Sequence, residues 1–288
     1  MIKVPLNIMI PAIIHQIWWQ GESNIPAKYD AYRKSYRDQH KDWKIICWDA
    51  PAIRNLIATH YPSYYELFES YPEMIQKIDV GKYFILEHHG GFYVDMDTRC
   101  EKSLEPLRQY DLVLSEMEVH CEEATNCNMI RVMTMNEYST RPFLNNGFIG
   151  CVPNHPLWKM SLFPRLSTHQ KRRWFMFHNA YIFYSTGPTL LTLSVRDGRY
   201  EKKPNVLVAE PIYFDPCSYY YYRCIKSPKT YVTHRYAGTW HSAMTNLMIQ
   251  MGIHKNLYMG ASITVLLVIV MLLLFADNGP LNVYRRRS

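Results

Sequence analysis

The 288-residue sequence lacks the cysteine patterns that would define a zinc module or a disulfide scaffold. Its seven cysteines include no CxxC pair, and the spacings from Cys121 to Cys127 and from Cys217 to Cys224 fit no zinc pattern. One or two disulfides would be compatible with a lumenal compartment, but the odd count requires none. The sequence also has no internal repeat and no low-complexity linker, which argues for one globular domain.

A clear secretory signal is missing at the N-terminus. Residues 4–14 (VPLNIMIPAII) contain Pro5, Asn7 and Pro11 and lack a cleavage site, and they form no N-terminal membrane span. Without a signal, a membrane span late in the chain would make a tail-anchored protein whose globular part lies in the cytosol.

An uncharged run near the C-terminus predicts one such span. Residues 257–276 (LYMGASITVLLVIVMLLLFA) form a twenty-residue stretch without charge. As a helix the stretch would measure about 30 Å, the thickness of the hydrocarbon core of a bilayer. Because Lys255 flanks one end and Arg285–Arg287 the other, the positive-inside trend favours the arginine end in the cytosol. This conflicts with the tail-anchored topology, so the side of the catalytic part is left open.

Charge and composition constrain the partners only weakly. The net charge of +7 is modest, and the clusters Lys171–Arg173 and Arg285–Arg287 suit either a solvated face or contact with anionic lipid. We predict no nucleic-acid partner. Aromatic residues make up 14% of the chain, which suits sugar-stacking surfaces and equally a tyrosine-rich core.

Apolar runs alternate with helical patterns along the globular part. We expect buried strands at residues 8–19, 43–48, 92–96 and 111–115. We expect helices at residues 29–40, from 51 to about 68, and 73–88, the last ended by Gly90 and Gly91. Strands alternating with helices predict an α/β fold with an open, mostly parallel sheet.

Two aspartates follow the strand predicted at residues 92–96, in the stretch HHGGFYVDMDTRC (88–100). On an extended chain Asp95 and Asp97 would point to the same side, where the carboxylates repel each other unless a cation lies beside them. Oxygen ligands suit Mg²⁺ or Mn²⁺, and the carboxyl end of a strand in an α/β sheet is where ligands bind. Alone, the D-x-D pattern is a weak signal, since two solvated loop aspartates would look the same.

The surrounding motifs resemble those of the DXD-containing sugar transferases of glycosyltransferase family thirty-two. The resemblance starts with residues 79–86 (DVGKYFIL) and 89–97 (HGGFYVDMD). Further blocks follow the family's order: IHQIW at 14–18, NGFIG and PNHP within 146–156, STGP at 185–188 and HRYAGTWH at 234–241. Together they cover most of residues 12–241. The sequence resembles in particular the fungal-type mannosyl transferases that act on inositol phosphoceramide.

This resemblance implies a GT-A-like catalytic domain over residues 1–245, with a mixed, mostly parallel sheet. A juxtamembrane linker at 246–256, the span at 257–276 and a basic tail at 277–288 would complete the chain. It also implies a retaining transfer of a sugar, with mannose favoured. The donor would be a nucleotide-diphosphate sugar (GDP-mannose favoured, a UDP-sugar open) and the acceptor a membrane-associated lipid or glycan. The implied cofactor is Mn²⁺ or Mg²⁺, and the implied location is an endomembrane of the Golgi or ER type.

The resemblance further implies site residues at matching positions. The implied catalytic residues are Asp95, Asp97 and Asn146. The implied metal ligands are Asp97, Asp95 and His234, with His241 as a second histidine candidate. The implied donor-binding residues are Trp18, Asp79, Lys82, Tyr83, Gly91 and Trp240. Thr186 and Gly187 are placed on the acceptor side, and no nucleophile is assigned.

Each position has a plainer interpretation, and the sequence departs from the family in places. Trp18 could be a core tryptophan, and Asp79 with Lys82 a surface ion pair. Lys82 stands where the family has arginine, which keeps the charge but loses the bidentate fork.

Two other functions compete with a sugar transferase. A catalytically inactive carbohydrate-binding protein that keeps the fold is one alternative, and the Lys82 departure is its support. A glycoside hydrolase is the other, disfavoured because its carboxyls should lie about 5 to 10 Å apart across the substrate.

Overall fold

The computed structural model describes residues 9–117, 143–172, 178–216 and 227–235. The chain divides into two units at Trp240, and every described residue belongs to the first. The predicted span at 257–276, and with it Trp240 and His241, lies outside the described residues. No helix in the described part of the chain has the length and hydropathy needed to cross a bilayer.

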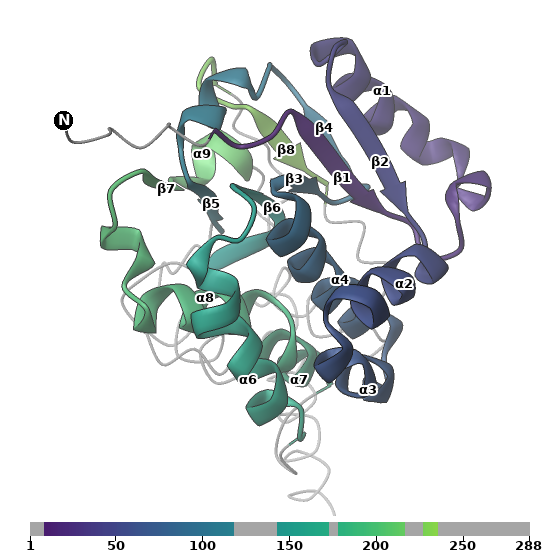
Figure 1. The fold of residues 1–288 in the computed structure, drawn as a ribbon. Helices are drawn as coiled ribbons and strands as arrows, with labels where there is room; N and C mark the ends of the chain where they lie inside the picture. Colours follow the sequence, from purple (N-terminus) through teal and green to yellow (C-terminus); the bar gives the residue numbers. More distant parts are fainter. Residues whose placement is uncertain (1–8, 118–142, 173–177, 217–226, 236–288) are drawn as a thin grey trace, which may run out of the picture. The chain divides into compact units, whose positions relative to one another are not determined.

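A six-stranded sheet organises the domain, in the order β2-β1-β3-β6-β5-β7 (Figure 1). Strand β1 pairs in parallel with β2 and β3, and β5 pairs in parallel with β7, whereas β6 is antiparallel to both of its neighbours. The strands are Ile13–Ile17 (β1), Lys44–Trp48 (β2), Gly91–Val94 (β3), Leu112–Glu116 (β5), Leu144–Cys151 (β6) and Val206–Ala209 (β7). The predicted α/β class with a mixed, mostly parallel sheet is confirmed.

A second, two-stranded sheet joins distant parts of the chain. Strand β4 (Thr98–Cys100) directly follows the two aspartates, and it pairs antiparallel with β8 (Val232–His234). In this register Thr98 lies opposite His234. The pairing therefore brings the C-terminal end of the described chain to the D-x-D turn.

Helices connect most of the strands. They are Asp30–Gln39 (α1), Ala50–His60 (α2), Pro62–Ser70 (α3), Met74–His89 (α4), Phe163–His169 (α6), His178–Ser185 (α7), Pro188–Asp197 (α8) and Pro211–Phe214 (α9). Short 3-10 turns lie at Glu22–Asn24, Ala27–Tyr29, Glu105–Gln109 and Tyr200–Lys202, and a π turn at Trp158–Leu162.

Local sequence explains where these helices begin and end. Helix α2 begins after Asp49, whose side chain accepts a hydrogen bond from the Ala52 amide at 2.9 Å. Helix α4 begins with a capping box at Glu73 and ends at Gly90, which has a φ of 63°. The single helix predicted from residue 51 to 68 is wrong: the chain breaks at Tyr61, because Pro62 cannot donate an amide hydrogen bond and begins a new helix instead.

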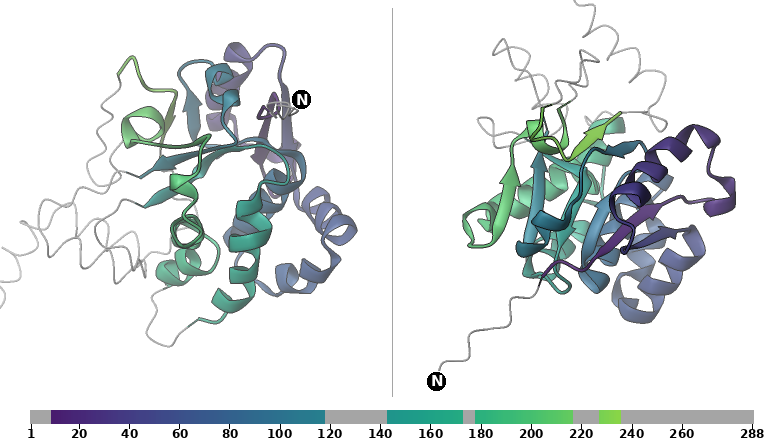
Figure 2. Two further views of the ribbon diagram at one scale, coloured as in Figure 1. Left: turned by 60° about the vertical axis from the view of Figure 1, so that its left-hand side comes forward. Right: turned by 90° about the horizontal axis from the view of Figure 1, so that it is seen from above.

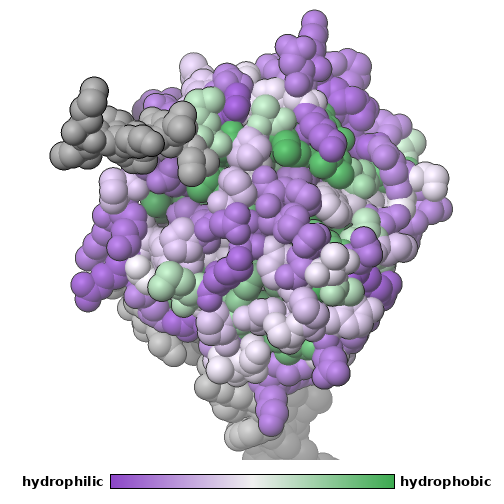
Figure 3. Space-filling view, viewed as in Figure 1, coloured by the Kyte–Doolittle hydropathy of each residue, from purple (hydrophilic) through white to green (hydrophobic). Residues whose placement is uncertain are grey.

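Two layers of core cover the two faces of the sheet, as the turned view in Figure 2 shows. On one face α2, α3, α4, α6 and α8 contribute buried apolar side chains, centred on Phe84, Trp158 and Phe163. On the other face α1, α9 and the β4–β8 pair contribute Tyr36, Phe214 and Val232. The outside seen in Figure 3 is largely hydrophilic, with hydrophobic residues scattered in small groups. The layers hold the carboxyl ends of β1 and β3 together at one edge of the sheet.

Candidate functional site

Three side chains from two segments meet at the carboxyl end of β3. Asp95 and Asp97 lie in the turn between β3 and β4, and His234 ends β8. One ligand atom from each of the three lies within 4.8 Å of the others. The Nε2 atom of His234 is 3.2 Å from an Asp97 carboxylate oxygen. Carboxylates this close, in one turn, are poorly placed to flank a glycosidic bond from opposite sides, which disfavours the hydrolase alternative.

Main-chain hydrogen bonds fix the turn that carries the two aspartates. The Asp95 amide donates to the Gly147 carbonyl at 2.9 Å, and the Arg235 amide donates to the Asp97 carbonyl at 3.1 Å. Thr98 donates to the Asp95 carbonyl through both its amide and its hydroxyl. The carboxylates are thus positioned by β6 and by the residue after β8 before any ligand binds.

Gly147 lets the side chains of Asp95, Asn145 and His234 approach the β6 backbone closely. A Cβ atom there would lie 2.6 Å from Asp95 Oδ2, 3.1 Å from Asn145 Oδ1 and 3.2 Å from His234 Cε1. Only a residue without a side chain fits, so two carboxylates and an imidazole can meet beside it. Two hard oxygen donors and one imidazole form a donor set that suits Mn²⁺ or Mg²⁺.

Carboxylates on several sides keep His234 protonated. Burial alone would lower its pKa, but Asp97, Asp215 and Asp95 outweigh burial and raise the pKa of His234 to about 9. The imidazolium therefore balances part of the negative charge of the aspartate pair. The cation that the sequence predicts beside the aspartate pair is therefore supplied in part by the protein itself, from β8.

Asn145 and Asp215, which the sequence analysis missed, hold this histidine from behind. The Asn145 Nδ2 atom lies 3.4 Å from His234 Nδ1 and donates to Asp215 Oδ2 at 3.2 Å. The Gly147 amide donates to Asn145 Oδ1 at 2.7 Å, which fixes the amide orientation. The sequence holds a weak signal for Asn145: it is a polar residue beside Asn146 on a buried strand, where neighbouring side chains face opposite sides and each needs its own polar partner. Asp215 lies in no motif and is brought in by tertiary contacts alone.

A second, buried charge cluster lies beside the first. The Lys82 ammonium on α4 is 2.9 Å from Asp79 Oδ1, 3.6 Å from Asp95 Oδ1 and 3.3 Å from the Asn146 carbonyl. It also lies 4.6 Å from the centre of the Tyr93 ring. Lys82 is 2% exposed and Asp79 4%, so the alternative of a surface ion pair is wrong.

The two clusters share Lys82, which stays charged. Burial would lower the pKa of Lys82, but the attraction of Asp79 and Asp95 raises it above the usual value. Asp95 also accepts a hydrogen bond from the Tyr93 hydroxyl at 2.7 Å. Each aspartate of the D-x-D turn thus has its own cation nearby, Lys82 for Asp95 and His234 for Asp97.

Residues that the sequence analysis separated into donor and acceptor sides meet at Asp79. The Asn146 side chain donates to Asp79 Oδ1 at 2.9 Å, and the Thr186 hydroxyl donates to Asp79 Oδ2 at 3.3 Å. The Tyr83 hydroxyl donates to the Thr186 carbonyl at 2.8 Å. Gly187 directly precedes α8, and a Cβ atom on it would lie 3.0 Å from the Cα atom of Phe183.

Two further residues predicted to bind the donor, Trp18 and Gly91, lie at opposite ends of their strands. Trp18 is half-buried just beyond the carboxyl end of β1, with its indole N–H donating to the Asn24 carbonyl at 3.0 Å. Gly91 lies at the amino end of β3, the far end from Asp95. Its φ is 89°, and a Cβ would lie 2.7 Å from the Ile13 carbonyl, so packing within the sheet already explains this glycine. Trp240 and His241 fall outside the described residues.

The family described as "glycosyltransferase sugar-binding region containing DXD motif" matches residues 26–114, which include Asp79, Lys82 and both aspartates of the turn. This match confirms, over these residues, the predicted resemblance to the DXD-containing sugar transferases.

Curated relatives are similar over most of the chain. Mannosyl phosphorylinositol ceramide synthase SUR1 of Saccharomyces cerevisiae is 28% identical over 248 residues, covering 85% of this chain and 55% of the relative. Inositol phosphoceramide mannosyltransferase 2 of Schizosaccharomyces pombe is 29% identical over 236 residues, covering 81% and 59%. Uncharacterized glycosyltransferase L373 of Acanthamoeba polyphaga mimivirus is 29% identical, covering 74% and 75%. The chain spans less than two thirds of the length of the two yeast relatives.

Solved structures show weaker likeness. The PaToxG glycosyltransferase has a TM-score of 0.45 at 16% identity, covering 66% of this chain and 70% of that one. The galactosyltransferase LgtC has a TM-score of 0.42 at 16% identity, covering 80% and 90%. These scores are too low to assign a site or a substrate.

Proposed function

We propose that the chain is a metal-dependent, retaining mannosyltransferase that uses a GT-A-like domain. It takes the sugar from a nucleotide-diphosphate donor, GDP-mannose in the first instance, and transfers it to a membrane-associated lipid or glycan. The observation that carries this proposal is the meeting of Asp95, Asp97 and His234 beside Gly147, with one ligand atom of each within 4.8 Å of the others. Mannose is favoured because the yeast relatives are named as mannosyltransferases.

The cation would be held by Asp97, Asp95 and the imidazole of His234. A bound Mn²⁺ or Mg²⁺ supplies Lewis-acid stabilisation of the negative charge that develops on the leaving diphosphate. Because a ligating histidine must be neutral, metal binding would release the His234 proton. Asn145 and Asp215 would keep the imidazole facing the aspartates while this proton leaves.

The buried cluster would position the reacting part of the donor. Lys82 holds Asp95 from the protein side, which keeps that carboxylate from turning away from Asp97 and His234. Asp79 holds the Asn146 amide and the Thr186 hydroxyl, so these groups are oriented before the sugar arrives. Trp18, half-buried at the same edge of the sheet, offers a ring on which a nucleobase could stack.

Two features support a membrane-associated acceptor. The Schizosaccharomyces pombe relative is named as an inositol phosphoceramide mannosyltransferase and the Saccharomyces cerevisiae relative as a mannosyl phosphorylinositol ceramide synthase, and both names refer to a lipid. The uncharged residues 257–276 would anchor the chain in an endomembrane of the Golgi or ER type. The anchor would hold the catalytic domain near the bilayer surface, where a lipid headgroup or a membrane-bound glycan is presented.

The inactive-protein alternative depended on the lysine at position 82. In the structure this lysine still contacts Asp79, Asp95 and the Asn146 carbonyl, so the change from arginine leaves the cluster connected. No described contact favours an inactive protein over an enzyme.

A thermal-shift panel with the full chain in phosphatidylcholine nanodiscs tests the proposal. GDP-mannose, GDP-glucose, UDP-glucose and UDP-galactose are compared, each with Mn²⁺ and with EDTA. We expect one donor, GDP-mannose, to raise the melting temperature with Mn²⁺ and not with EDTA. Slow, metal-dependent release of free mannose from the bound donor would separate an enzyme from an inactive binder. Equal stabilisation by every donor in EDTA would contradict the metal site.

A further inference from the structure

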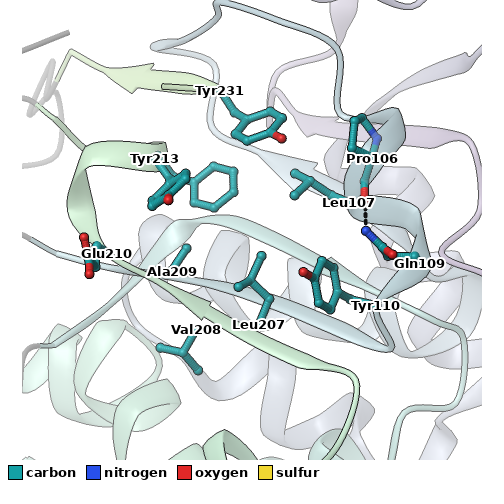
Figure 4. Close-up of a pocket in the computed structure, with 11 residues that line it drawn as sticks. Pro106, Leu107, Gln109, Tyr110, Leu207, Val208, Ala209, Glu210, Tyr213 and Tyr231 are labelled. Atoms are coloured by element: carbon teal, nitrogen blue, oxygen red, sulfur yellow. Dashed lines mark hydrogen bonds between the residues drawn. The ribbon is translucent and has the colours of Figure 1, made fainter. Parts of the chain in front are cut away.

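A pocket of about 370 Å³ lies away from the metal cluster, between β7, α9 and the 3-10 turn at Glu105–Gln109 (Figure 4). Its volume falls within the range of about 300 to 1,000 Å³ that is usual for small-molecule sites. No contact in the proposed transfer mechanism uses it. The pocket therefore needs its own explanation.

The walls of this pocket combine flat rings with polar groups. Tyr110, Tyr213 and Tyr231 come from three different segments and point their rings towards one space, with Leu207 below them (Figure 4). Gln109 and the exposed Glu210 add an amide and a carboxylate. This mixture suits a ring that carries C–H groups on its faces and hydroxyls around its edge, because the C–H face packs on an aromatic ring while the hydroxyls find polar partners.

Two of the tyrosines are held in place without a ligand. The Lys102 ammonium lies 4.0 Å from the centre of the Tyr231 ring, and the Phe214 ring stacks on Tyr231 at 5.6 Å. The Tyr231 amide donates to the Tyr213 carbonyl at 2.7 Å, which ties the two segments together. A pocket with fixed rings binds with little ordering cost.

The pocket is joined to the metal cluster by a short strand. Tyr231 directly precedes β8, and β8 ends at His234, so the pocket wall lies three positions before the proposed metal ligand. In extended chain this is about 10 Å. That separation would let one molecule place one ring in the pocket and another group at the site of transfer.

We propose that this pocket binds a cyclic polyol of the acceptor, a pyranose or an inositol ring, at a position one ring removed from the reacting hydroxyl. The proposal rests on the proposed transferase function and names where that function holds its acceptor. Tyr110 and Tyr213 supply the stacking surfaces, Tyr231, which Lys102 and Phe214 already cover, forms the wall between them, and Gln109 and Glu210 bond to the ring hydroxyls.

Saturation-transfer difference NMR on the full chain in phosphatidylcholine nanodiscs tests this site. The probes are methyl α-mannopyranoside and myo-inositol, which distinguish a glycan from a lipid headgroup, with glycerol as an acyclic polyol. We expect saturation of ring C–H protons for at least one cyclic probe and none for glycerol. Tyr213→Ala should weaken binding about tenfold, the size expected for removing one stacked ring. Tyr65→Ala on α3, outside the pocket, is the matched control.

Manganese binding, followed by electron paramagnetic resonance, separates the two proposals. If Tyr213→Ala keeps its Mn²⁺ affinity but loses the cyclic probe, the pocket assignment is supported and the fold is intact. Tyr213→Phe, which keeps the ring, should retain most of the binding. Wild-type chain that binds Mn²⁺ and donor but neither cyclic probe, or that loses no binding in Tyr213→Ala, would overturn the pocket alone. Wild-type chain that binds no Mn²⁺ would overturn the transferase proposal instead.

Discussion

Two clusters of oppositely charged side chains lie side by side in this domain. The closed cluster, Asp79 with Lys82, is buried, and the open cluster, Asp95 and Asp97 with His234, is partly exposed. In the closed cluster the side chains of Asp79 and Lys82 are 6% and 2% exposed, and Asp79 accepts from three donors. In the open cluster the side chains of Asp95 and Asp97 are 28% and 15% exposed, and one ligand atom of each lies within 4.8 Å of His234. The comparison shows how one fold can use carboxylates in two ways: a buried one orients its neighbours, and partly exposed ones can be reached by a ligand.

The largest effect should come from breaking the closed cluster. Lys82→Met leaves Asp79 buried without its cation, which we expect to cost about 3 to 5 kcal/mol in the free energy of unfolding. Urea unfolding of the full chain measures this cost. Lys34→Met removes a lysine from an exposed ion pair with Asp38 and should cost less than about 1 kcal/mol.

A double variant sharpens the prediction for the closed cluster. Asp79→Asn combined with Lys82→Met removes both charges, so it should recover part of the stability lost in Lys82→Met alone. A Lys82→Met variant that is no less stable than Lys34→Met would show that the buried pair does not hold the domain together.

Breaking the open cluster should affect binding more than folding. Asp97→Ala removes a proposed metal ligand. Mutation of a group that only hydrogen-bonds to a ligand typically costs about 10- to 100-fold in metal affinity, so we expect loss of the ligand itself to cost more than about 100-fold. Electron paramagnetic resonance of free Mn²⁺ measures the affinity, and Asp38→Ala on the exposed face of α1 is the control. Unchanged Mn²⁺ affinity in Asp97→Ala would refute the metal site.

The sequence predicts those parts of the two clusters that depend on local patterns, and it does not predict those that depend on packing between distant segments. The D-x-D turn, the helix that carries Asp79 and Lys82, and the strand before the turn follow from local patterns, because periodicity, the capping box and the double glycine are local signals. That the same pair is buried, and that Lys82 reaches Asp95, does not follow from a spacing of three. It depends on β6 and α7, which lie far away in sequence, packing over α4.

The missed residues differ in the same way. Asn145 has a weak local signal, since it neighbours the predicted Asn146 on a strand and must face the other side. Asp215 has none: it directly follows α9, and the packing of α9 against β8 brings it near His234. Long-range pairing is the information that a single sequence without an alignment does not display.

A smaller effect should follow from adding a methyl group at Gly147. Gly147→Ala places a Cβ 2.6 Å from Asp95 Oδ2, so the carboxylate must turn aside, and we expect Mn²⁺ affinity to fall about 10- to 100-fold. Gly81→Ala is the control, because its Cβ would also be tightly packed, 3.0 Å from the buried Ile53 side chain, but away from the metal cluster. If Gly147→Ala binds Mn²⁺ as tightly as Gly81→Ala, the cation lies elsewhere.

A final effect, which appears only below pH 6.5, concerns a second buried histidine, whose surroundings are the reverse of those of His234. His15 on β1 bonds to the Gly90 carbonyl at 2.9 Å through Nε2 and accepts from the Trp48 indole at 3.1 Å through Nδ1. Burial lowers the pKa of His15 from 6.5 to about 3, helped by His89 and Lys44 and opposed by the bond to Gly90. It is therefore neutral in the folded chain at the pH at which His234 is charged.

The sign of the resulting pH dependence follows from linkage. Above pH 6.5 His15 is neutral in both states and costs nothing, while between 6.5 and about 3 only the unfolded chain takes up its proton, so stability falls as the pH falls. One proton corresponds to about 1.4 kcal/mol per pH unit. His15→Gln, whose amide can donate to Gly90 and accept from Trp48, should show a shallower loss of stability between pH 6.5 and 4 in urea unfolding. An unchanged slope in His15→Gln would mean that the imidazole is not held neutral, and the contrast with His234 would fail.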